Sequence, residues 1–340
     1  MANEERVVHQ PIHPDVAEKL DPEYIAFHNA TTAYTIPLYR LPQIDPALRL
    51  GSHVGGGAEP LKVGSIRDIS FSKCTARVYT PEGSAPATGW PVLLFFHGGK
   101  VFGGWTIGGL NSQLSFLTNA CKRAQCVVIS VDYRLAPENP YPAAVEDAEE
   151  ALHWVYRHGK SELNVDINKF AVGGGSSGGN LAAVVALKAV LAEPPVPLVL
   201  QLLFVPVIDN TATTSGEKYK SWAENANTVA LPPESMLWFR DNYLPNHEDR
   251  AKWDSSPIFA PDEAFKKAPK TWIAVMELDI LRDEALAYGE KLQKAGVEVD
   301  LKYYKSVPHP THIMDGAVMQ VGRQIISDAV YALNNAFSTT

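Results

Sequence analysis

The chain has 340 residues, of which 46% are apolar, enough to bury one large core with insertions or two modest ones. Lys and Arg number 30 against 38 Asp and Glu, and the resulting net charge of −8 argues against a nucleic-acid partner. The three cysteines, Cys74, Cys121 and Cys126, form no disulfide framework and indicate a reducing compartment.

The N-terminal twenty residues lack the apolar run of a signal peptide, and no stretch approaches about 18 consecutive apolar residues. We therefore expect a cytoplasmic protein without an integral membrane segment. The sequence carries no signal for its oligomeric state.

Residues 1–60 are rich in proline and irregular, apart from one helix expected over 14–33, and we interpret them as an arm or lid. After residue 61, short apolar runs alternate with amphipathic stretches. The predicted strands cover 91–96, 126–131, 169–173, 198–205, 271–277 and 297–304. The predicted helices cover 142–158, with Gly159 as its C-terminal cap, 180–193 and 283–295.

This alternation predicts an α/β fold, in which helices flank both faces of a mostly parallel central sheet. Residues 209–255 interrupt the alternation with a polar and then aromatic segment. We therefore divide the chain into an N-terminal arm with cap helices (1–60), a first part of the core (61–208), a cap insertion (209–255) and a second part of the core (256–340).

The densest motif is FAVGGGSSGGN, from Phe170 to Asn180, where an apolar strand meets a glycine-rich turn before a helix. This order is typical of the nucleophile elbow G-x-S-x-G, in which a strained turn exposes a serine hydroxyl only if its neighbours are small. Two registers fit, one with Ser176 at the apex and the other with Ser177. A purely structural glycine turn is an alternative.

The same run also contains G-x-G-x-x-G, as Gly173, Gly175 and Gly178, which is the pattern of a dinucleotide pyrophosphate loop. Such a loop usually lies in the first strand–helix–strand unit, with an acidic residue about 20 positions later. Here that position falls near Glu193, at a helix end beside two prolines, which disfavours the nucleotide interpretation.

A second glycine motif, His97-Gly98-Gly99-Lys100, directly follows the predicted strand 91–96. A His-Gly-Gly loop at this place aims backbone N–H groups at a tetrahedral intermediate, and glycine lets the acyl group approach the main chain. A plain glycine turn with a structural His97 is the alternative.

Three motifs together resemble the hormone-sensitive-lipase-like branch of the α/β-hydrolases, which typically shows HGGG, DYRLAPE and GDSAGGN. The matching segments are HGG from His97, DYRLAPE from Asp132 and GGSSGGN from Gly174, and the similarity extends over about 60–335. The resemblance implies an α/β-hydrolase fold with Ser176 as the nucleophile. It also implies an oxyanion hole formed by the N–H groups of Gly98, Gly99 and Ser177.

The acid and base follow the serine in the chain order expected for this fold. Asp279, after a predicted strand, matches the first aspartate of the D-x-L-x-D-E motif of the branch, and His309 matches the histidine of V-P-H-x-F. His312 is the other candidate base, and a metal site built on these two histidines lacks further ligands. Asp283 and Glu284 read as ordinary carboxylates in the first turn of a helix.

The expected function is therefore that of a serine esterase acting on a small-molecule ester with a short acyl group, with no cofactor and no metal. Aromatic residues of the lid are candidates for its substrate pocket, each with core packing as the alternative. They are Phe102, Trp105, Trp222 and Trp238, with Tyr24, Phe27 and Phe239 as further candidates.

The chain departs from the motifs of the branch at Lys100, where a third glycine is usual, and at Thr311, where an aromatic residue is usual. Gly175 and Ser177 replace the usual Asp and Ala. These changes keep two other classes of function open: a lyase or cyclase built on the same fold, and a non-catalytic small-molecule receptor.

Overall fold

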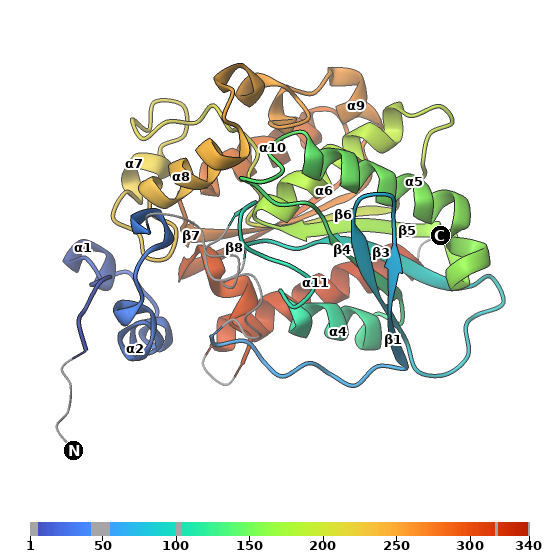
Figure 1. The fold of residues 1–340 in the computed structure, drawn as a ribbon, viewed down its shortest axis with the longest axis horizontal. Coiled ribbons are helices and arrows are strands. Elements are labelled where there is room, and N and C mark those ends of the chain that lie inside the picture. Colours follow the sequence, from blue (N-terminus) through green and yellow to red (C-terminus); the bar gives the residue numbers. More distant parts are fainter. Residues whose placement is uncertain (1–5, 42–54, 100–103, 317–318, 339–340) are drawn as a thin grey trace.

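The computed structural model of the chain describes residues 6–41, 55–99, 104–316 and 319–338. Over these residues the chain forms one eight-stranded sheet with helices against both faces (Figure 1). The strands are β1 (Ser65–Ser70), β2 (Thr75–Thr80), β3 (Trp90–Phe96), β4 (Val127–Asp132), β5 (Val165–Gly175), β6 (Leu200–Phe204), β7 (Thr271–Leu278) and β8 (Val299–Pro308). Their order in the sheet is β1-β2-β4-β3-β5-β6-β7-β8.

The β1–β2 and β2–β4 pairs are antiparallel, and all pairs from β4 to β8 are parallel. The mostly parallel sheet that the sequence predicts is confirmed. Because the carboxyl ends of parallel strands lie at one edge, the loops that follow β3, β5, β7 and β8 converge there.

The main helices lie in two layers. Figure 1 shows α5, α6 and α10 on one face of the sheet and α4 and α11 on the other. The helices are α1 (Pro14–Ala17), α2 (Pro22–Ala30), α4 (Leu114–Arg123), α5 (Ala143–Leu163), α6 (Ser177–Leu191), α7 (Ser221–Glu224), α8 (Pro233–Tyr243), α9 (Asp262–Lys267), α10 (Arg282–Lys294) and α11 (Gln320–Ser338). Short 3₁₀ segments are η1 (Thr32–Tyr34), η2 (Leu38–Arg40), η3 (His247–Ala251), η4 (Pro257–Phe259) and η5 (His309–Ile313).

Strand β3 shows why the central strands read as unbroken apolar runs. Leu94 and Phe96 belong to the core on the α5–α6 side, whereas Leu93 and Phe95 belong to the core on the α4–α11 side. All four side chains are fully buried, and each contributes about 1.5–3 kcal/mol through removal from water. A strand buried on both faces favours an apolar side chain at every position.

Two helix predictions are wrong in their limits. The helix expected over 14–33 is divided into α1 and α2, because Asp21 accepts the N–H of Glu23 and Pro22 begins the second helix. The helix expected to end at Gly159 continues to Leu163 and ends with Asn164 in the left-handed conformation.

Gly159 has a packing role inside α5. A methyl group at this position would lie 2.8 Å from Val165 Cγ2, so glycine lets the helix approach β5 closely. The sequence pattern cannot distinguish such a packing glycine from a helix cap. The predictions above also omitted β1, β2, α4 and α11.

Residues 209–255, the expected cap insertion, lie between β6 and β7 and carry α7, α8 and η3. In Figure 1 α7 and α8 lie at the same side of the molecule as α1 and α2, and α8 packs against η2. Arg240 of α8 ties the segment together by donating to the carbonyl oxygens of Asn210 (3.1 Å) and Ala212 (2.7 Å). The division of the chain into four parts stays a prediction.

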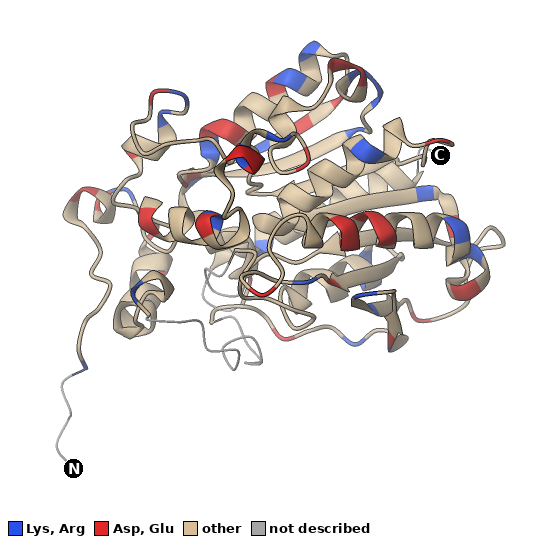
Figure 2. Cartoon of the chain, turned by 45° about the horizontal axis from the view of Figure 1, so that its top comes forward, with Lys and Arg blue, Asp and Glu red and all other residues tan. Residues whose placement is uncertain are grey.

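Charged side chains of both signs are mixed over the outer helices and loops (Figure 2). Lys188, for example, links α6 to α5 through Glu149 at 3.1 Å. Exposed pairs of this kind contribute about 0–1 kcal/mol each, so apolar burial dominates the stability of the fold. Within the described ranges, no helix has the length and apolar character needed to cross a bilayer.

Candidate active site

Ser176 stands at the turn between β5 and α6, at the carboxyl edge of the sheet. Its φ of 54° and ψ of −115° are strained for a residue with a side chain, and such strain is typical of a functional turn. The N–H of Ser176 donates to the Phe204 carbonyl at 2.8 Å, which ties the turn to the end of β6. The glycine-rich run therefore forms a strand–turn–helix elbow with Ser176 at its apex.

The positions of Gly174 and Gly178, on either side of Ser176, have no room for a side chain. A methyl group at Gly174 would lie 2.1 Å from the Gly178 oxygen, and one at Gly178 would lie 2.0 Å from the Phe96 oxygen. The backbones of β3, β5 and α6 thus touch at the turn. A dinucleotide loop needs room beside its glycines for a pyrophosphate, whereas main-chain atoms fill the space beside Gly174 and Gly178.

A chain of hydrogen bonds connects Ser176 to two residues far away in sequence. His309 Nε2 lies 2.9 Å from Ser176 Oγ, and His309 Nδ1 lies 2.7 Å from Asp279 Oδ2. The Asp279 carboxylate can only accept, so Nδ1 carries the proton and Nε2 is left to accept the serine hydroxyl. Asp279 and His309 are both buried.

The loops after β7 and β8 hold these two side chains in place. The Leu281 N–H donates to Asp279 Oδ1 at 3.0 Å, and Asn225 Nδ2 donates to the Asp279 carbonyl at 3.0 Å. His309 begins η5, directly after the end of β8. Asp279 is therefore oriented by the main chain of its own loop and by the cap.

His312 does not reach Ser176 in place of His309. Its Nδ1–H donates to the His309 carbonyl at 3.2 Å, and its ring stacks on Phe204 with 5.6 Å between centroids. Burial and the neighbouring His309 lower the pKa of His312 to about 3, so this ring stays neutral. Within the described part of the chain, no group of three or more His, Cys, Asp or Glu residues is arranged to hold a metal ion.

The His97–Gly98 loop lies against the elbow. Tyr133 stacks on the His97 ring with 4.4 Å between centroids, and its hydroxyl donates to the His97 carbonyl at 2.7 Å. His97 Nδ1–H donates to the Gly98 carbonyl at 3.0 Å, and burial lowers the pKa of His97. His97 is thus a neutral structural residue that shapes the loop.

Gly98 differs from its predicted role. Its N–H, expected to face an oxyanion, donates instead to Gln113 Oε1 at 2.9 Å. Gly99 lies further along the loop at the cavity, and Ser177 begins α6, where the first N–H groups of a helix have no partner within it. Lys100, which stands where the third glycine of this motif is usual, falls outside the described residues.

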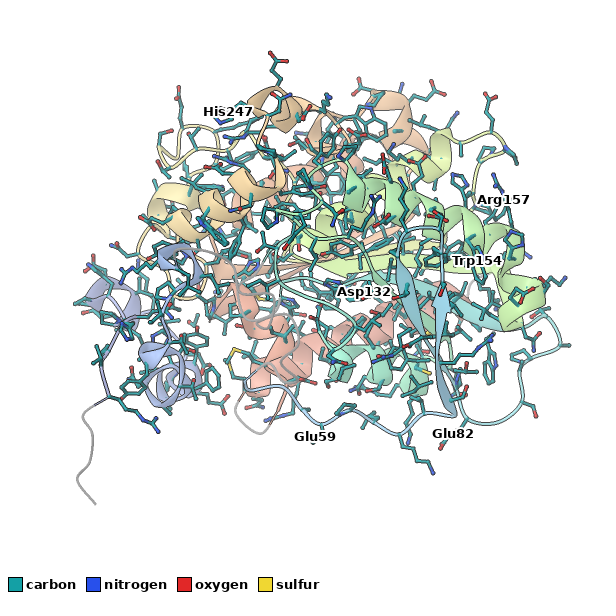
Figure 3. The ribbon with its side chains drawn as sticks, viewed as in Figure 1. Glu59, Glu82, Asp132, Trp154, Arg157 and His247 are labelled. Carbon is teal, nitrogen blue, oxygen red and sulfur yellow. The ribbon has the colours of Figure 1, made fainter. Side chains whose placement is uncertain are left out.

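The DYRLAPE motif contacts the His97–Gly98 loop and links it to α5. Asp132, labelled in Figure 3, ends β4, and its Oδ1 lies 4.0 Å from His97 Nε2. Arg134 then donates from Nε to Asp147 Oδ1 at 2.9 Å and from its backbone N–H to Asp147 Oδ2 at 2.8 Å. This pair joins the loop after β4 to α5, which explains why the motif is followed by an aspartate 13 residues beyond its arginine.

A cavity adjoins Ser176 and His309. The core contributes its polar wall and α8 contributes apolar side chains from the cap. Its lining residues are Gly98, Gly99, Gly104, Trp105, Gln113, Ser176, Ser177, Val207, Leu231, Met236, Phe239, His309, Pro310, His312 and Ile313.

The predicted pocket residues have different outcomes. Trp105 lines the cavity and stacks on Tyr243 with 4.3 Å between centroids. Trp222 and Trp238 are not among its lining residues. Trp222 donates its indole N–H to Glu284, and Trp238 packs edge-on against Phe239 with 5.3 Å between centroids. Phe102 falls outside the described residues.

Glu284 is more than the ordinary helix carboxylate expected from its position. It is fully buried, accepts the Ile208 N–H at 2.8 Å and Trp222 Nε1–H at 3.2 Å, and connects α10 to the loop after β6. Burial raises the pKa of Glu284 to about 8. Asp283 accepts the Ser221 N–H at 2.8 Å and so holds α7.

Several cavity residues carry no signal in the sequence. Gln113, Leu231 and Met236 belong to no motif, and nothing in their spacing predicts that they face Ser176. Phe239 was a lid candidate, and it covers Gly104, where a methyl group would lie 2.9 Å from Phe239 Cβ.

Comparison with known proteins agrees with this geometry. Residues 93–313 match the sequence profile of a family described as alpha/beta hydrolase fold. A protein of Schizosaccharomyces pombe described as an AB hydrolase superfamily protein is 44% identical over 340 residues, covering 96% of this chain and 97% of the relative. The carboxylic ester hydrolase LipN of Mycobacterium tuberculosis is 40% identical over 253 residues, covering 72% of this chain and 63% of the relative.

Solved structures show the same fold. The crystal structure of carboxyl esterase 2 from the mycorrhizal fungus Tuber melanosporum matches with a TM-score of 0.80 and 26% identity. The match covers 94% of this chain and 99% of that one.

Proposed function

The chain belongs to the α/β-hydrolase family, in its hormone-sensitive-lipase-like carboxylesterase branch, and on that premise we propose that it is a serine carboxylesterase with Ser176 as the nucleophile. The observation that carries this proposal is the hydrogen-bonded chain Ser176–His309–Asp279, with distances of 2.9 and 2.7 Å. A nucleophile, a base within hydrogen-bond reach and a group that orients the base are what acyl transfer requires.

The proton moves along this chain. His309 Nε2 takes the proton from Ser176 Oγ as the oxygen attacks the ester carbonyl, and Asp279 stabilises the imidazolium that forms. The imidazolium then gives the proton to the departing alcohol, which leaves an acyl group on Ser176. A water activated by His309 hydrolyses the acyl-enzyme and restores the free serine.

The negative oxygen of the tetrahedral intermediate needs hydrogen-bond donors. We assign this role to the N–H groups of Gly99 and Ser177, with the positive end of the α6 dipole behind Ser177. Gly98 supports the loop, because its own N–H already donates to Gln113. Loss of one such donor typically lowers kcat by about 10²–10³-fold.

The cavity suits a short acyl group on a fairly bulky or aromatic alcohol. Its cap wall consists of Leu231, Met236 and Phe239, which favours apolar contact. We therefore propose soluble acetate and butyrate esters as better substrates than long-chain lipids. Faster turnover of an emulsified long-chain ester than of p-nitrophenyl butyrate would contradict this part of the proposal.

The test is hydrolysis of p-nitrophenyl acetate and butyrate by the wild type and by Ser176→Ala and His309→Ala. We expect kcat to fall by about 10⁴-fold or more in both variants. His158→Ala is the matched control, because His158 is exposed on α5, and it should retain wild-type kcat. A fluorophosphonate probe should label the wild type and leave Ser176→Ala unlabelled.

A folded wild type that neither hydrolyses these esters nor reacts with the probe would contradict the esterase proposal. That result would favour the lyase, cyclase or receptor alternatives. Labelling without ester turnover would indicate an activated serine that serves another reaction.

A further inference from the structure

The loop that precedes the cavity is anchored at one residue from two sides. The Gly98 carbonyl accepts His97 Nδ1–H at 3.0 Å, and the Gly98 N–H donates to Gln113 Oε1 at 2.9 Å, both within the buried interior. A methyl group at Gly98 would lie 2.7 Å from the Gly175 oxygen, so this loop presses directly on the residue before the nucleophile. The position of Gly99, the next residue, follows from these contacts.

Gln113 reaches this loop from an unusual backbone position. It directly precedes α4 with a φ of 60°, in the left-handed region that disfavours residues with side chains. Its side chain makes no capping hydrogen bond to α4 and points instead to Gly98. The residue is 7% exposed, so its amide lies in the interior and adjoins the cavity.

Gly175 leaves the space that the Gln113 amide occupies. A methyl group at Gly175 would lie 2.7 Å from Gln113 Nε2 and 3.0 Å from His312 Nε2. The φ of Gly175 lies outside the left-handed region, so its backbone admits other residues, and only this space excludes them. An aspartate usually stands here in the GDSAGGN motif, and its carboxylate would point at the same place.

We propose that Gln113 is a positioning residue that takes the place of this aspartate, although it comes from another part of the chain. Its amide oxygen holds Gly98, and thereby Gly99, in the geometry needed to bind the oxyanion. Gly175 is then the matching partner that makes room for the amide. This inference rests on the proposed esterase function, because the loop matters only if an oxyanion forms beside it.

The chemistry of the replacement has a consequence for the reaction. A carboxamide is a neutral acceptor, and the adjoining His312 ring is neutral as well, so neither side chain places a fixed negative charge beside the developing oxyanion. Removal of the acceptor would release the Gly98 N–H and loosen the loop. The ground-state binding of the ester depends mainly on the apolar cap wall, so the loss should fall on kcat and spare KM.

The first experiment compares Gln113→Met, Gln113→Glu and the wild type with p-nitrophenyl butyrate. Met keeps the length of the side chain and removes the acceptor, whereas Glu retains an acceptor toward Gly98. We expect Gln113→Met to lower kcat by about 10–100-fold with KM within about threefold, because a displaced donor acts like a partly lost one. Gln113→Glu should lose less than Gln113→Met.

A transition-state analogue gives a readout that a merely structural role would not move. A trifluoromethyl ketone forms a tetrahedral adduct whose oxyanion needs the same donors. Its affinity should fall in Gln113→Met by about the factor lost in kcat. Asn119→Ala in α4 is the matched control, and it should retain both wild-type values, because the Asn119 side chain contacts Ser115 and Arg123 and does not line the cavity.

The second experiment is a double-mutant cycle with Gly175→Asp. If an aspartate at 175 takes over the contact with Gly98, Gln113→Ala should cost about 10–100-fold in the wild-type background and less than about threefold in the Gly175→Asp background. Equal losses in both backgrounds would overturn the pairing of the two residues.

The outcomes separate the two proposals. Wild-type turnover that is lost in Ser176→Ala establishes the esterase whatever the Gln113 variants do. If the wild type is an active esterase, two results would overturn the positioning role. One is a kcat of Gln113→Met within twofold of the wild-type value, and the other is an equal loss of kcat in the Met and Glu variants. A wild type without any turnover would overturn both.

Discussion

The two walls of the active-site cavity are built in different ways. The wall from the core consists of segments that follow β3, β5, β6 and β8. Its shape depends on backbone contacts such as that between Gly178 and the Phe96 oxygen. The wall from the cap consists of side chains of α8 and its preceding loop, namely Leu231, Met236 and Phe239.

This difference affects what each wall can tolerate. On the core side, a methyl group added at Gly98, Gly174 or Gly178 meets main-chain atoms, which cannot move without displacing a strand or a loop. On the cap side, apolar side chains can be exchanged for others of similar volume at a cost usually below about 1.5 kcal/mol. The core wall should therefore control the reaction, and the cap wall should control which esters enter.

The largest expected effect concerns Asp279, which contacts His309 on the core side. Asp279→Asn should lower kcat for p-nitrophenyl butyrate by about 10⁴-fold, because an amide can donate to His309 Nδ1 and so favours the tautomer that cannot accept from Ser176. Asp283→Asn is the matched control, since Asp283 holds α7 outside the triad. Similar losses in both variants would mean that Asp279 acts through the fold alone.

The next effect concerns the stability of the core wall. Gly178→Ala places a methyl group 2.0 Å from the Phe96 oxygen and should lower the free energy of unfolding by more than about 3 kcal/mol. At Gly296, with a φ of 93° and open space around it, alanine should cost only about 1–2 kcal/mol. Urea denaturation of both variants measures the contrast, and equal losses would contradict it.

A third prediction concerns the junction between core and cap at Glu284. Its pKa is raised to about 8 by burial, so the folded protein keeps its proton where the unfolded chain has lost it. The contribution of this group to the free energy of unfolding is complete below about pH 4.5 and is lost as the pH rises through about 8. Between pH 6 and pH 9 this loss amounts to roughly 2–3 kcal/mol.

The variant Glu284→Gln cannot ionise and should show a flatter stability profile over this pH range in urea denaturation. At pH 6 it should be less stable than the wild type, because an amide presents a donor to the Trp222 indole N–H. Parallel profiles of the two proteins would show that Glu284 is already ionised in the folded state.

The smallest effect tests the cap wall. Met236→Ala should raise the ratio of kcat/KM for p-nitrophenyl hexanoate to that for acetate by about threefold to tenfold, because it opens space for additional methylenes. Trp238→Leu, on the same helix and outside the cavity lining, should leave the ratio unchanged. A shift in the Trp238 variant as large as that in the Met236 variant would contradict the division between the two walls.

The positions of the three residues that we propose as the triad could be read from the sequence, because they lie in turns with strong local constraints. The strand–turn–helix order around Ser176, and the positions of Asp279 and His309 at strand ends, leave short motifs that a reader of the sequence can find. The mostly parallel sheet followed from apolar runs buried on both faces, as in β3.

The pocket was much less predictable, because its residues are brought together only by packing. The sequence marks Trp105, Trp222 and Trp238 equally as aromatic residues, yet only Trp105 reaches the cavity, while Trp222 binds the buried Glu284. Leu231 and Met236 look like any other apolar residues of a helix and its preceding loop.

The sequence by itself thus determined the fold class, the elbow and the order of the triad residues, since each depends on local backbone geometry or on burial patterns. Only the tertiary structure decided that the Gly98 N–H binds Gln113 and that Gly175 faces the same amide. The Gly98–Gln113 hydrogen bond spans 15 residues, and Gly175 lies 62 positions after Gln113. Both contacts depend on how the sheet brings the loops after its strands together, which short motifs do not record.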